Sequence, residues 1–416
     1  MATEPQGTGP AAPADGPDPT SAEPAAAPAP APEAAPAAAL EAAPGAAPAA
    51  AAEAAPAGPQ PPHVIYRWDL DKTYLQTEFD TVRQLLRTAF EGPEDKRTVP
   101  GAATLLRELK RGAPAPGGPS EPGRPSGGAR ICFISGSPRQ MRRVLTEKLR
   151  LDGVEYDEFI LKPNLRNMLT GRFRAMREQV GYKLPALLTG RAGVAAETHE
   201  VCFGDDAESD GFIYSLYGDV LAGRVAKDLL ERVLTDAGVY PGDAARAVSL
   251  AAALPRADAV ERIFIHLDRR SPPSRFDRYG LRLVPVYNYF QVALVLYQDR
   301  RLTAAAVVRV AVEMVDKHGY SIEVLRNSLH DLLRRWRLRS EAVQALGAAI
   351  AEGAGEQDLL PALGALPGTR DLLRSLARGL RDLGPLDAPP PPPSLDESPI
   401  DYLQALEVDL PRKRKR

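Results

Sequence analysis

The stretch "VIYRWDLDKTYL", residues 64–75, decides the fold. It begins as an apolar run rich in β-branched and aromatic residues, which predicts a buried strand. It ends in two aspartates, Asp69 and Asp71, with Thr73 two positions further on. Two carboxylates this close repel each other unless a cation lies between them or one of them takes a proton. The rest of the chain must therefore supply a partner for this pair.

Segments typical of strands and helices alternate after this first strand. Apolar spacing predicts helices over residues 77–92, 100–112, 139–153 and 164–183, and strands over residues 131–135, 156–162, 199–204, 262–268 and 279–290. This alternation indicates an α/β fold with a doubly wound, largely parallel sheet, whose site lies at the carboxyl ends of the strands. We expect the domain to span residues 63–299.

The two ends of the chain differ from this domain in composition. Residues 1–62 are almost entirely Ala, Pro and Gly without Lys or Arg, so they cannot bury a core and we expect them to be disordered. Residues 300–384 have helical periodicity throughout and predict a helical extension packed on the sheet domain. Residues 385–416 hold a proline-rich linker, a short amphipathic segment and the basic tail "PRKRKR".

The amphipathic segment "IDYLQALEVDL", residues 400–410, places Ile400, Leu403 and Leu406 on one helical face. It is too short to form a stable helix alone. We expect it to dock into a groove, either of a partner or of the chain's own helical extension.

Charge and cysteine content narrow the class of protein. The formal net charge is -2, and once the acidic N-terminus and the basic tail are set aside the middle of the chain is formally neutral. Net charge therefore makes no case for nucleic-acid binding. The N-terminus lacks a signal-peptide pattern and no apolar run reaches the roughly 20 residues of a membrane span. We expect a cytoplasmic protein in which Cys132 and Cys202 are buried, reduced thiols.

Polar side chains follow three of the predicted strands. They are Asp69 and Asp71 after the first strand, Ser135 and Ser137 after "ICFI", and Asp205, Asp206 and Asp210 after "EVCFG". The carboxyl ends of parallel strands meet at one edge of the sheet, so we expect these groups to lie together. Mg²⁺ in proteins takes one or two carboxylates plus substrate phosphate and water. The sequence therefore predicts a Mg²⁺ site here, which also relieves the repulsion between the aspartates.

These segments resemble, in order, the four motifs of the haloacid-dehalogenase-like (HAD) phosphohydrolases. The first motif, DxDx(T/V) after a strand, is "DLDKT" here, and the second, a Ser or Thr ending the next core strand, is Ser135. The third, a lysine at the start of a later helix, is Lys183, with Lys162 of "FILK" as its rival. The fourth, of the GDxxxxD type, is "GDDAESD". The set spans residues 64–210.

Within this superfamily the chain resembles the phosphatidate phosphatases of the actin-patch-associated type. The resemblance lies in "FISGSP", in "GDDAESDGFIY" and in "YKL" around Lys183. That family usually has a third acid where this chain has Lys72, and often an aromatic residue where this chain has Arg139. The resemblance therefore bears more directly on phosphatase chemistry than on the substrate, for which phosphatidate or a related lipid phosphate is the first expectation.

The resemblance implies a role for each motif residue. Asp69 would be the nucleophile that forms an aspartyl-phosphate, and Asp71 would protonate the leaving alcohol and then deprotonate water. Ser135 and Lys183 would hold the phosphoryl oxygens, and the substrate would also be lined by Thr73, Gly136, Ser137 and Arg139. Mg²⁺ would be held by Asp69, the backbone carbonyl of Asp71 and Asp205, supported by Asp210 or Asp206.

Only short inserts occupy the positions where HAD enzymes carry caps, so we expect a minimal cap and a site open to large substrates. The arginines between "FILKP" and Lys183 are either a solvated helix face or a lip for an anionic membrane surface: Arg166, Arg172, Arg174 and Arg177. Two further functions stay open. The substrate could be a phosphoprotein, a nucleic-acid end or a soluble ester, or the fold could be a non-catalytic scaffold, which loss of Asp69 or Asp71 would have marked.

Overall fold

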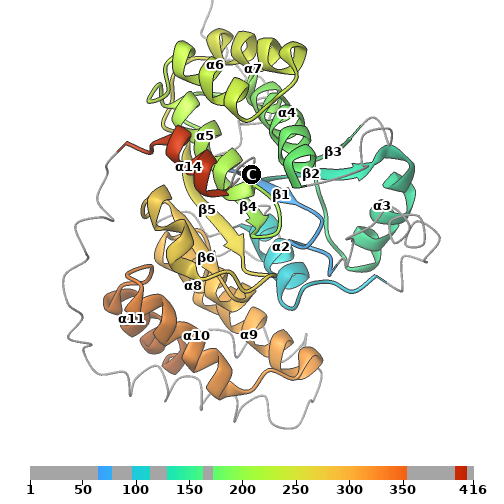
Figure 1. The fold of residues 1–416 in the computed structure, drawn as a ribbon. Coiled ribbons are helices and arrows are strands. Elements are labelled where there is room, and N and C mark those ends of the chain that lie inside the picture. The colour runs from blue at the N-terminus through green and yellow to red at the C-terminus, as the bar shows by residue number, and fades with distance from the viewer. Residues whose placement is uncertain (1–63, 77–95, 113–128, 163–171, 354–398, 410–416) are drawn as a thin grey trace, which may run out of the picture. The chain divides into compact units, whose positions relative to one another are not determined.

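The structure is a computed structural model that describes residues 64–76, 96–112, 129–162, 172–353 and 399–409 (Figure 1). Several predictions lie outside these residues: disorder in residues 1–62, the helix over residues 77–92, the end of the helical extension, the proline-rich linker and the basic tail. In the described part of the chain, no helix has the length and apolar character that a membrane crossing requires.

The core of the fold is a six-stranded sheet in the order β3-β2-β1-β4-β5-β6. All neighbouring strands are parallel, which confirms the predicted α/β class. The strands are β1 (Val64–Asp69), β2 (Ala129–Pro138), β3 (Glu158–Lys162), β4 (His199–Asp205), β5 (Val260–His266) and β6 (Leu283–Val286). The strand order reverses between β1 and β4, and ligands of such sheets bind in the crevice at that reversal.

One face of the sheet packs against a large apolar cluster. Its helices are α2 (Ala102–Arg111), α3 (Arg142–Leu151), α8 (Tyr289–Gln298), α9 (Ala304–His318), α10 (Ile322–Arg334) and α11 (Ser340–Ala351). Trp68 of β1 stacks on Phe203 and Tyr289, with ring centroids 4.0 and 5.5 Å apart. Side chains of α9, α10 and α11 belong to the same cluster as those of β1. The described part of the helical extension therefore shares the core of the sheet domain.

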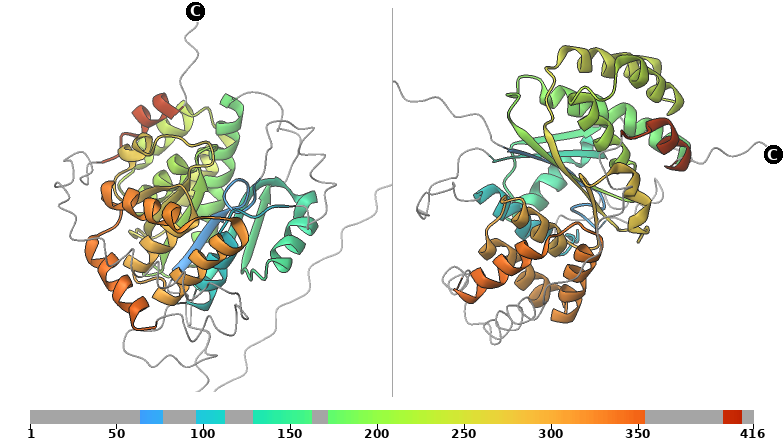
Figure 2. Two further views of the ribbon diagram at one scale, coloured as in Figure 1. Left: turned by 90° about the horizontal axis from the view of Figure 1, so that it is seen from below. Right: turned by 90° about the vertical axis from the view of Figure 1, so that its left-hand side faces the viewer.

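The other face carries a second apolar cluster, so helices cover both faces of the sheet (Figure 2). Its elements are α4 (Arg172–Arg191), α5 (Asp210–Leu221), α6 (Lys227–Asp236), α7 (Pro241–Ala253), the 3₁₀ helix η4 (Pro273–Tyr279) and α14 (Tyr402–Asp409). This arrangement is the doubly wound one that the sequence predicts.

Helix α4 corrects the prediction that a helix ends at Lys183. The helix continues through Pro185 to Arg191, which puts Lys183 within the helix rather than at a helix start. Pro185 removes one backbone N–H from the helix. The apolar residues around it are buried on one face and hold the helix together: Val180, Leu184, Leu187 and Leu188.

The C-terminal helix α14 corrects the expected docking site of the amphipathic segment. It packs on α5 and α6, so its seat is the sheet domain of its own chain and not the helical extension. Tyr402 is buried, its hydroxyl donates to Asp219 Oδ2 at 2.6 Å, and its ring meets Phe212 edge-on at 5.7 Å. Leu406 is buried on the predicted face.

Candidate active site

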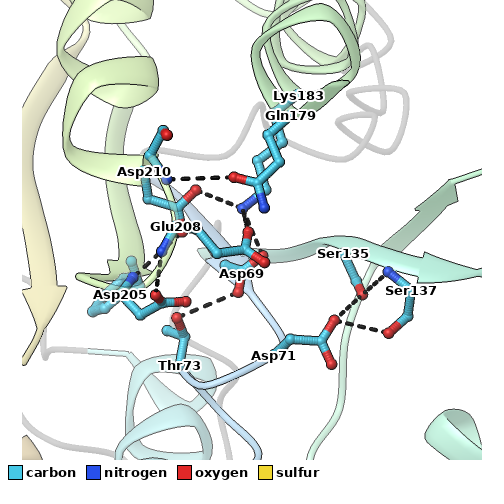
Figure 3. A network of polar contacts seen from close by, with 12 residues as sticks. Asp69, Asp71, Thr73, Ser135, Ser137, Gln179, Lys183, Asp205, Glu208 and Asp210 are labelled. Atoms are coloured by element: carbon cyan, nitrogen blue, oxygen red, sulfur yellow. Dashed lines mark hydrogen bonds and ion pairs between the residues drawn. The ribbon is translucent and has the colours of Figure 1, made fainter. Parts of the chain in front are cut away.

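The site begins where β1 and β4 end side by side. Asp69 is the last residue of β1 and Asp205 the last of β4, at the reversal of strand order. Asp210 opens helix α5, and Lys183 reaches the same place from α4 (Figure 3). Two strands and two helices therefore converge on one point.

Four carboxylates form an acidic cluster at this point: Asp69, Asp205, Glu208 and Asp210. One oxygen of each lies within 4.8 Å of the others, and only Glu208 is not fully buried. The ammonium of Lys183 is 2.8 Å from Asp69 Oδ1, 2.8 Å from Glu208 Oε2 and 2.5 Å from Asp210 Oδ1. One ammonium faces four carboxyl groups, so the cluster has fewer cations than acidic groups.

Two buried oxygens of the acidic cluster lack hydrogen bonds from the described residues. They are Asp205 Oδ2 and Asp69 Oδ1, although the latter has its ion pair with Lys183. A buried carboxylate oxygen without a donor is costly, so it indicates a ligand that the protein chain itself does not provide. An all-oxygen donor set of carboxylates is the kind that Mg²⁺ and Ca²⁺ prefer. The acidic cluster thus fits a hard divalent cation.

Burial and the neighbouring charges together shift the pKa values of the groups in the acidic cluster. Burial raises the pKa of Asp69 well above its usual value, and Asp210 and Glu208 raise it further while Lys183 lowers it. Burial likewise raises the pKa of Asp210 to about 6, with Lys183 acting against the rise. Burial alone lowers the pKa of Lys183, but the carboxylates around it raise it well above its usual value. Lys183 therefore stays protonated, and the cluster favours a further cation.

Asp71 lies in a different environment from Asp69. Its Oδ2 accepts hydrogen bonds from Ser135 Oγ at 2.9 Å and Ser137 Oγ at 2.8 Å. Burial raises the pKa of Asp71, and these two hydroxyls offset part of the rise. The Asp71 side chain is thus held apart from the acidic cluster, with a raised proton affinity. A metal contact through its backbone carbonyl stays a prediction.

The turn that carries Asp71 is fixed from two sides. Lys72 has a left-handed backbone with φ 61°, and its carbonyl accepts a hydrogen bond from His266 Nδ1 at 3.1 Å. The Tyr289 hydroxyl donates to the Thr73 carbonyl at 2.5 Å, and the Thr73 hydroxyl donates to Asp69 Oδ2 at 3.4 Å. These bonds hold the backbone after β1 so that Asp69 and Asp71 diverge.

Ser135, Gly136 and Ser137 lie near the end of β2, where its register with β3 shifts. Ser137 N donates to Ser135 Oγ at 2.9 Å, which orients the serine that holds Asp71. An added Cβ at Gly136 would meet nothing within 4 Å, so packing does not require a glycine there. Arg139 is exposed at the start of the 3₁₀ helix η2 (Arg139–Met141). The predicted contacts of Gly136 and Arg139 with substrate stay predictions.

The structure separates the rival residues that the sequence left open. Lys183 belongs to the acidic cluster, whereas Lys162 ends the edge strand β3, two strands away from β1. Asp206 accepts backbone N–H groups of Arg269 and Ser271 at 2.8 and 2.9 Å, so it anchors the loop after β5. Arg166 and the side chains of the other predicted lip arginines lie outside the described residues: Arg172, Arg174 and Arg177.

Sequence reasoning missed Glu208. This residue belongs to the acidic cluster, whereas Asp206, which the sequence suggested as a supporting metal ligand, does not. The sequence feature that could have indicated Glu208 is the density of acids in "DDAESD", where four of six residues are acidic. The turn from β4 into α5 brings Glu208 back over Asp205. Asp205 Oδ1 accepts the backbone N–H groups of Ala207 and Glu208 at 2.5 and 2.8 Å, and these bonds close that turn.

Comparison of the chain with protein-family models, curated proteins and solved structures finds no match. The function of the site therefore has to be argued from its own geometry and chemistry.

Proposed function

We propose that the protein is a Mg²⁺-dependent phosphatase of the HAD-like type, which passes the phosphoryl group of a monoester first to Asp69 and then to water. The observation that carries this proposal is that the two aspartates of "DLDKT" lie in different environments. Asp69 lies in the acidic cluster beside Lys183, whereas Asp71 is held by two serine hydroxyls with a raised pKa. Two carboxyls in contrasting environments are the arrangement expected of a nucleophile and a general acid.

In the first half of the proposed reaction, a carboxylate oxygen of Asp69 attacks phosphorus and the bond from phosphorus to the leaving oxygen breaks. Asp71 gives its proton to that oxygen, so an alcohol departs and an acyl phosphate remains on Asp69. Lys183 and Ser135 hold the transferred oxygens. When bound, Mg²⁺ would supply the positive charge that lets an anionic phosphoryl group approach these carboxylates.

In the second half, Asp71 takes a proton from water as the water oxygen attacks phosphorus. The bond to Asp69 breaks, inorganic phosphate leaves, and both aspartates return to their starting protonation states. Mg²⁺ would be held by the acidic cluster, including Glu208, whose carboxylate lies 2.8 Å from Lys183.

For the substrate, we propose a lipid phosphate such as phosphatidate, with the protein in peripheral contact with an anionic membrane. The support is the resemblance of "FISGSP" and "GDDAESDGFIY" to phosphatidate phosphatases. A phosphoprotein, a nucleic-acid end and a soluble ester are the other substrates that the same chemistry would accept.

The test is phosphate release from a panel of esters with Mg²⁺, including phosphatidate in mixed micelles, soluble monoesters, a phosphopeptide and a 5′-phosphorylated oligonucleotide. We expect turnover that chelation abolishes and Mg²⁺ restores, with radiolabelled phosphate trapped on Asp69 after acid quenching. Turnover that persists in the Asp69→Asn variant would contradict the proposed mechanism. A preference for the soluble esters would agree with the proposed reaction but would contradict a lipid phosphate as the preferred substrate.

A further inference from the structure

The two oxygens of the Asp71 carboxyl have different surroundings (Figure 3). Both serine hydroxyls donate to Oδ2, from Ser135 at 2.9 Å and from Ser137 at 2.8 Å. Oδ1 is buried as well, yet it has no hydrogen-bond partner within the part of the chain that the structure describes. An oxygen that accepts two O–H groups is the unprotonated oxygen of a carboxyl, so a proton on Asp71 would lie on Oδ1. Oδ1 is therefore the oxygen left for a reacting group.

The turn that carries Asp71 has a strained apex. The turn is closed at its base, where the N–H groups of Tyr74 and Leu75 both donate to the Leu70 carbonyl, at 3.0 and 2.9 Å. At the apex, Lys72 has a left-handed backbone with φ 61°, which is uncommon for a residue with a side chain. Such a conformation persists only where the surrounding structure holds it. The contacts that hold the apex therefore decide where the Asp71 side chain lies.

Two side chains from distant parts of the sequence hold this apex. His266, the last residue of β5, donates from Nδ1 to the Lys72 carbonyl at 3.1 Å. Tyr289, the first residue of α8, donates from its hydroxyl to the Thr73 carbonyl at 2.5 Å. The rings of His266 and Tyr289 stack on each other, with centroids 5.8 Å apart and an angle of 24° between their planes. Two consecutive carbonyls of the turn are thus held by one stacked pair of rings.

The stacked pair is also bound to the strand ends that carry the acidic cluster. Tyr289 is buried, and its ring stacks on Trp68, the residue before Asp69, with centroids 5.5 Å apart. His266 ends β5 directly beside the end of β4. The same two side chains therefore contact both the strands that carry the acidic cluster and the turn that carries Asp71. They fix the position of Asp71 relative to Asp69.

We propose that His266 and Tyr289 are positioning residues for the general acid, and that Asp71 delivers its proton from Oδ1. This inference rests on the proposed function, because it concerns the step in which the alcohol leaves. As the bond from phosphorus to the leaving oxygen breaks, that oxygen keeps the electron pair and takes the proton from Oδ1. The held carbonyls of the turn keep Oδ1 within reach of that oxygen, and the two serine hydroxyls stabilise the carboxylate that remains.

The effect of the two positioning residues should depend on the leaving group. Phenolate is a stronger base than 4-nitrophenolate, so its departure depends more on a proton from the enzyme. Phenyl phosphate and 4-nitrophenyl phosphate are therefore a pair of esters of similar shape that differ in their need for Asp71. The alcohol that leaves phosphatidate is more basic still. The quantity to compare is kcat/KM, because it reports the first half of the reaction, whereas the second half is the same for every ester.

The first test is Tyr289→Phe, which removes the hydroxyl and keeps the ring in its stack. We expect kcat/KM to fall about tenfold for phenyl phosphate and less than about threefold for 4-nitrophenyl phosphate. His266→Phe should act in the same direction, and His266→Asn should recover part of the loss, because its amide N–H can replace the Nδ1–H. Tyr402→Phe, which loses a buried hydroxyl bond of 2.6 Å far along the chain, is the matched control and should leave the ratio of the two esters unchanged.

The Asp71→Asn variant tests whether the two residues act through Asp71. In that background, Tyr289→Phe should change kcat/KM for phenyl phosphate by less than about twofold, because the step that it assists is already lost. Equal losses for the two esters in Tyr289→Phe alone would overturn the positioning role. A loss of about tenfold that persists in the Asp71→Asn background would overturn it as well.

Amide exchange in the metal-free protein separates this inference from the proposed reaction. The amides of Tyr74 and Leu75 close the base of the turn, so they should exchange about tenfold faster in Tyr289→Phe and at the wild-type rate in Tyr402→Phe. If exchange speeds up while the wild type hydrolyses no ester, the turn is held as inferred and the phosphatase fails. If esters are hydrolysed but neither the exchange nor the ratio of the esters changes, the phosphatase stands and the positioning role fails. Absence of both effects and of turnover overturns both.

Discussion

Strands β1 and β4 carry two groups of buried charge, and the two groups differ in how well their charges are matched. At the carboxyl ends, four carboxylates share the single ammonium of Lys183. Earlier in the same strands, Glu200 of β4 accepts hydrogen bonds from Arg67 of β1 at 2.6 and 2.9 Å, from Arg191 at 3.2 Å and from Tyr217 at 2.9 Å. Burial would raise the pKa of Glu200, but Arg67 and its hydrogen bonds lower it.

The matched pattern recurs where α14 docks. Asp219 accepts hydrogen bonds from Arg224 at 2.9 Å, from Arg282 at 2.6 Å and from Tyr402 at 2.6 Å, so it too has two guanidiniums and a phenol. Buried carboxylates that serve the fold are thus surrounded by donors and cations of the chain. Those at the carboxyl ends of the strands are not, which indicates that their missing partners are ligands.

The largest expected effect is on turnover, from a change in the acidic cluster, where the charges are not matched. Asp69→Asn should lower phosphatase turnover about 10³-fold or more, because an amide cannot form the acyl phosphate. The midpoint of thermal unfolding without Mg²⁺ should not fall, because the change removes one of several like charges. Steady-state phosphate release and a melting curve on the same preparation measure both quantities.

The matched control for that change is Asp206→Asn. Asp206 differs from Asp205 by one position, but its oxygens accept backbone N–H groups, which the remaining oxygen of Asn can still do in part. We expect its turnover to stay within about tenfold of the wild type and its stability to fall by about 1 kcal/mol. A loss of turnover as large as that of Asp69→Asn would place Asp206 among the metal ligands.

Around Glu200, where the charges are matched, replacing the carboxylate by an amide should lower stability. Glu200→Gln leaves the guanidiniums of Arg67 and Arg191 buried without their carboxylate, which should cost about 3–5 kcal/mol of unfolding free energy. Urea unfolding measures it. The control is Glu261→Gln on β5, whose partly exposed pair with Arg301 should contribute less than about 1 kcal/mol. Equal losses in the two variants would remove the contrast between buried and exposed pairs.

The pH dependence sharpens the comparison further. Because the folded-state pKa of Glu200 is lowered, its contribution is fully present above the unfolded value of about 4.3 and is lost as pH falls through the folded-state value. The difference in unfolding free energy between wild type and Glu200→Gln should therefore be constant from about pH 6 upward and shrink below about pH 4. A difference that grows on acidification would show that Glu200 is not held as a carboxylate.

The smallest effect is expected at the second matched carboxylate. Tyr402→Phe removes one donor from Asp219 but leaves both guanidiniums, so the cost should be about 1–2 kcal/mol. Amide exchange should speed up in α14 while the strands keep their protection. Faster exchange throughout β1 and β4 would instead make α14 part of the cooperative core.

The sheet itself was largely predictable from sequence. Buried parallel strands leave continuous apolar runs, and "ICFIS" and "RIFIHLD" both became strands. The continuation of α4 to Arg191 was not predictable from local signals, because Pro185 is typical of a helix end. The burial of the neighbouring apolar residues keeps the helix intact through Pro185. The docking site of α14 was not predictable from its apolar face alone, because the buried hydrogen bond from Tyr402 to Asp219 also holds the helix on the sheet domain.

In the site, Asp69, Asp205, Asp210 and Lys183 came together as the order of strand ends predicts. Glu208 was missed because it occupies a spacer position of the motif, and only the turn after β4 brings it over Asp205. Arg67 and Glu200 were missed too, although a lone charge inside each of two apolar strands is a signal that the strands are neighbours.

The position of β1 in the sheet has a kinetic consequence. Arg67 and Glu200 are 133 residues apart in sequence, yet they pair across adjacent strands, so β1 has a neighbour on that side only after β4 has been synthesised. Contacts this distant in sequence form late, because the loop must close first. During synthesis, the half of the sheet formed by β1, β2 and β3 would exist with Asp69 in place and no Asp205 beside it. If the acidic cluster binds a divalent cation as proposed, its affinity for that cation should appear only after β4 has joined β1 in the sheet.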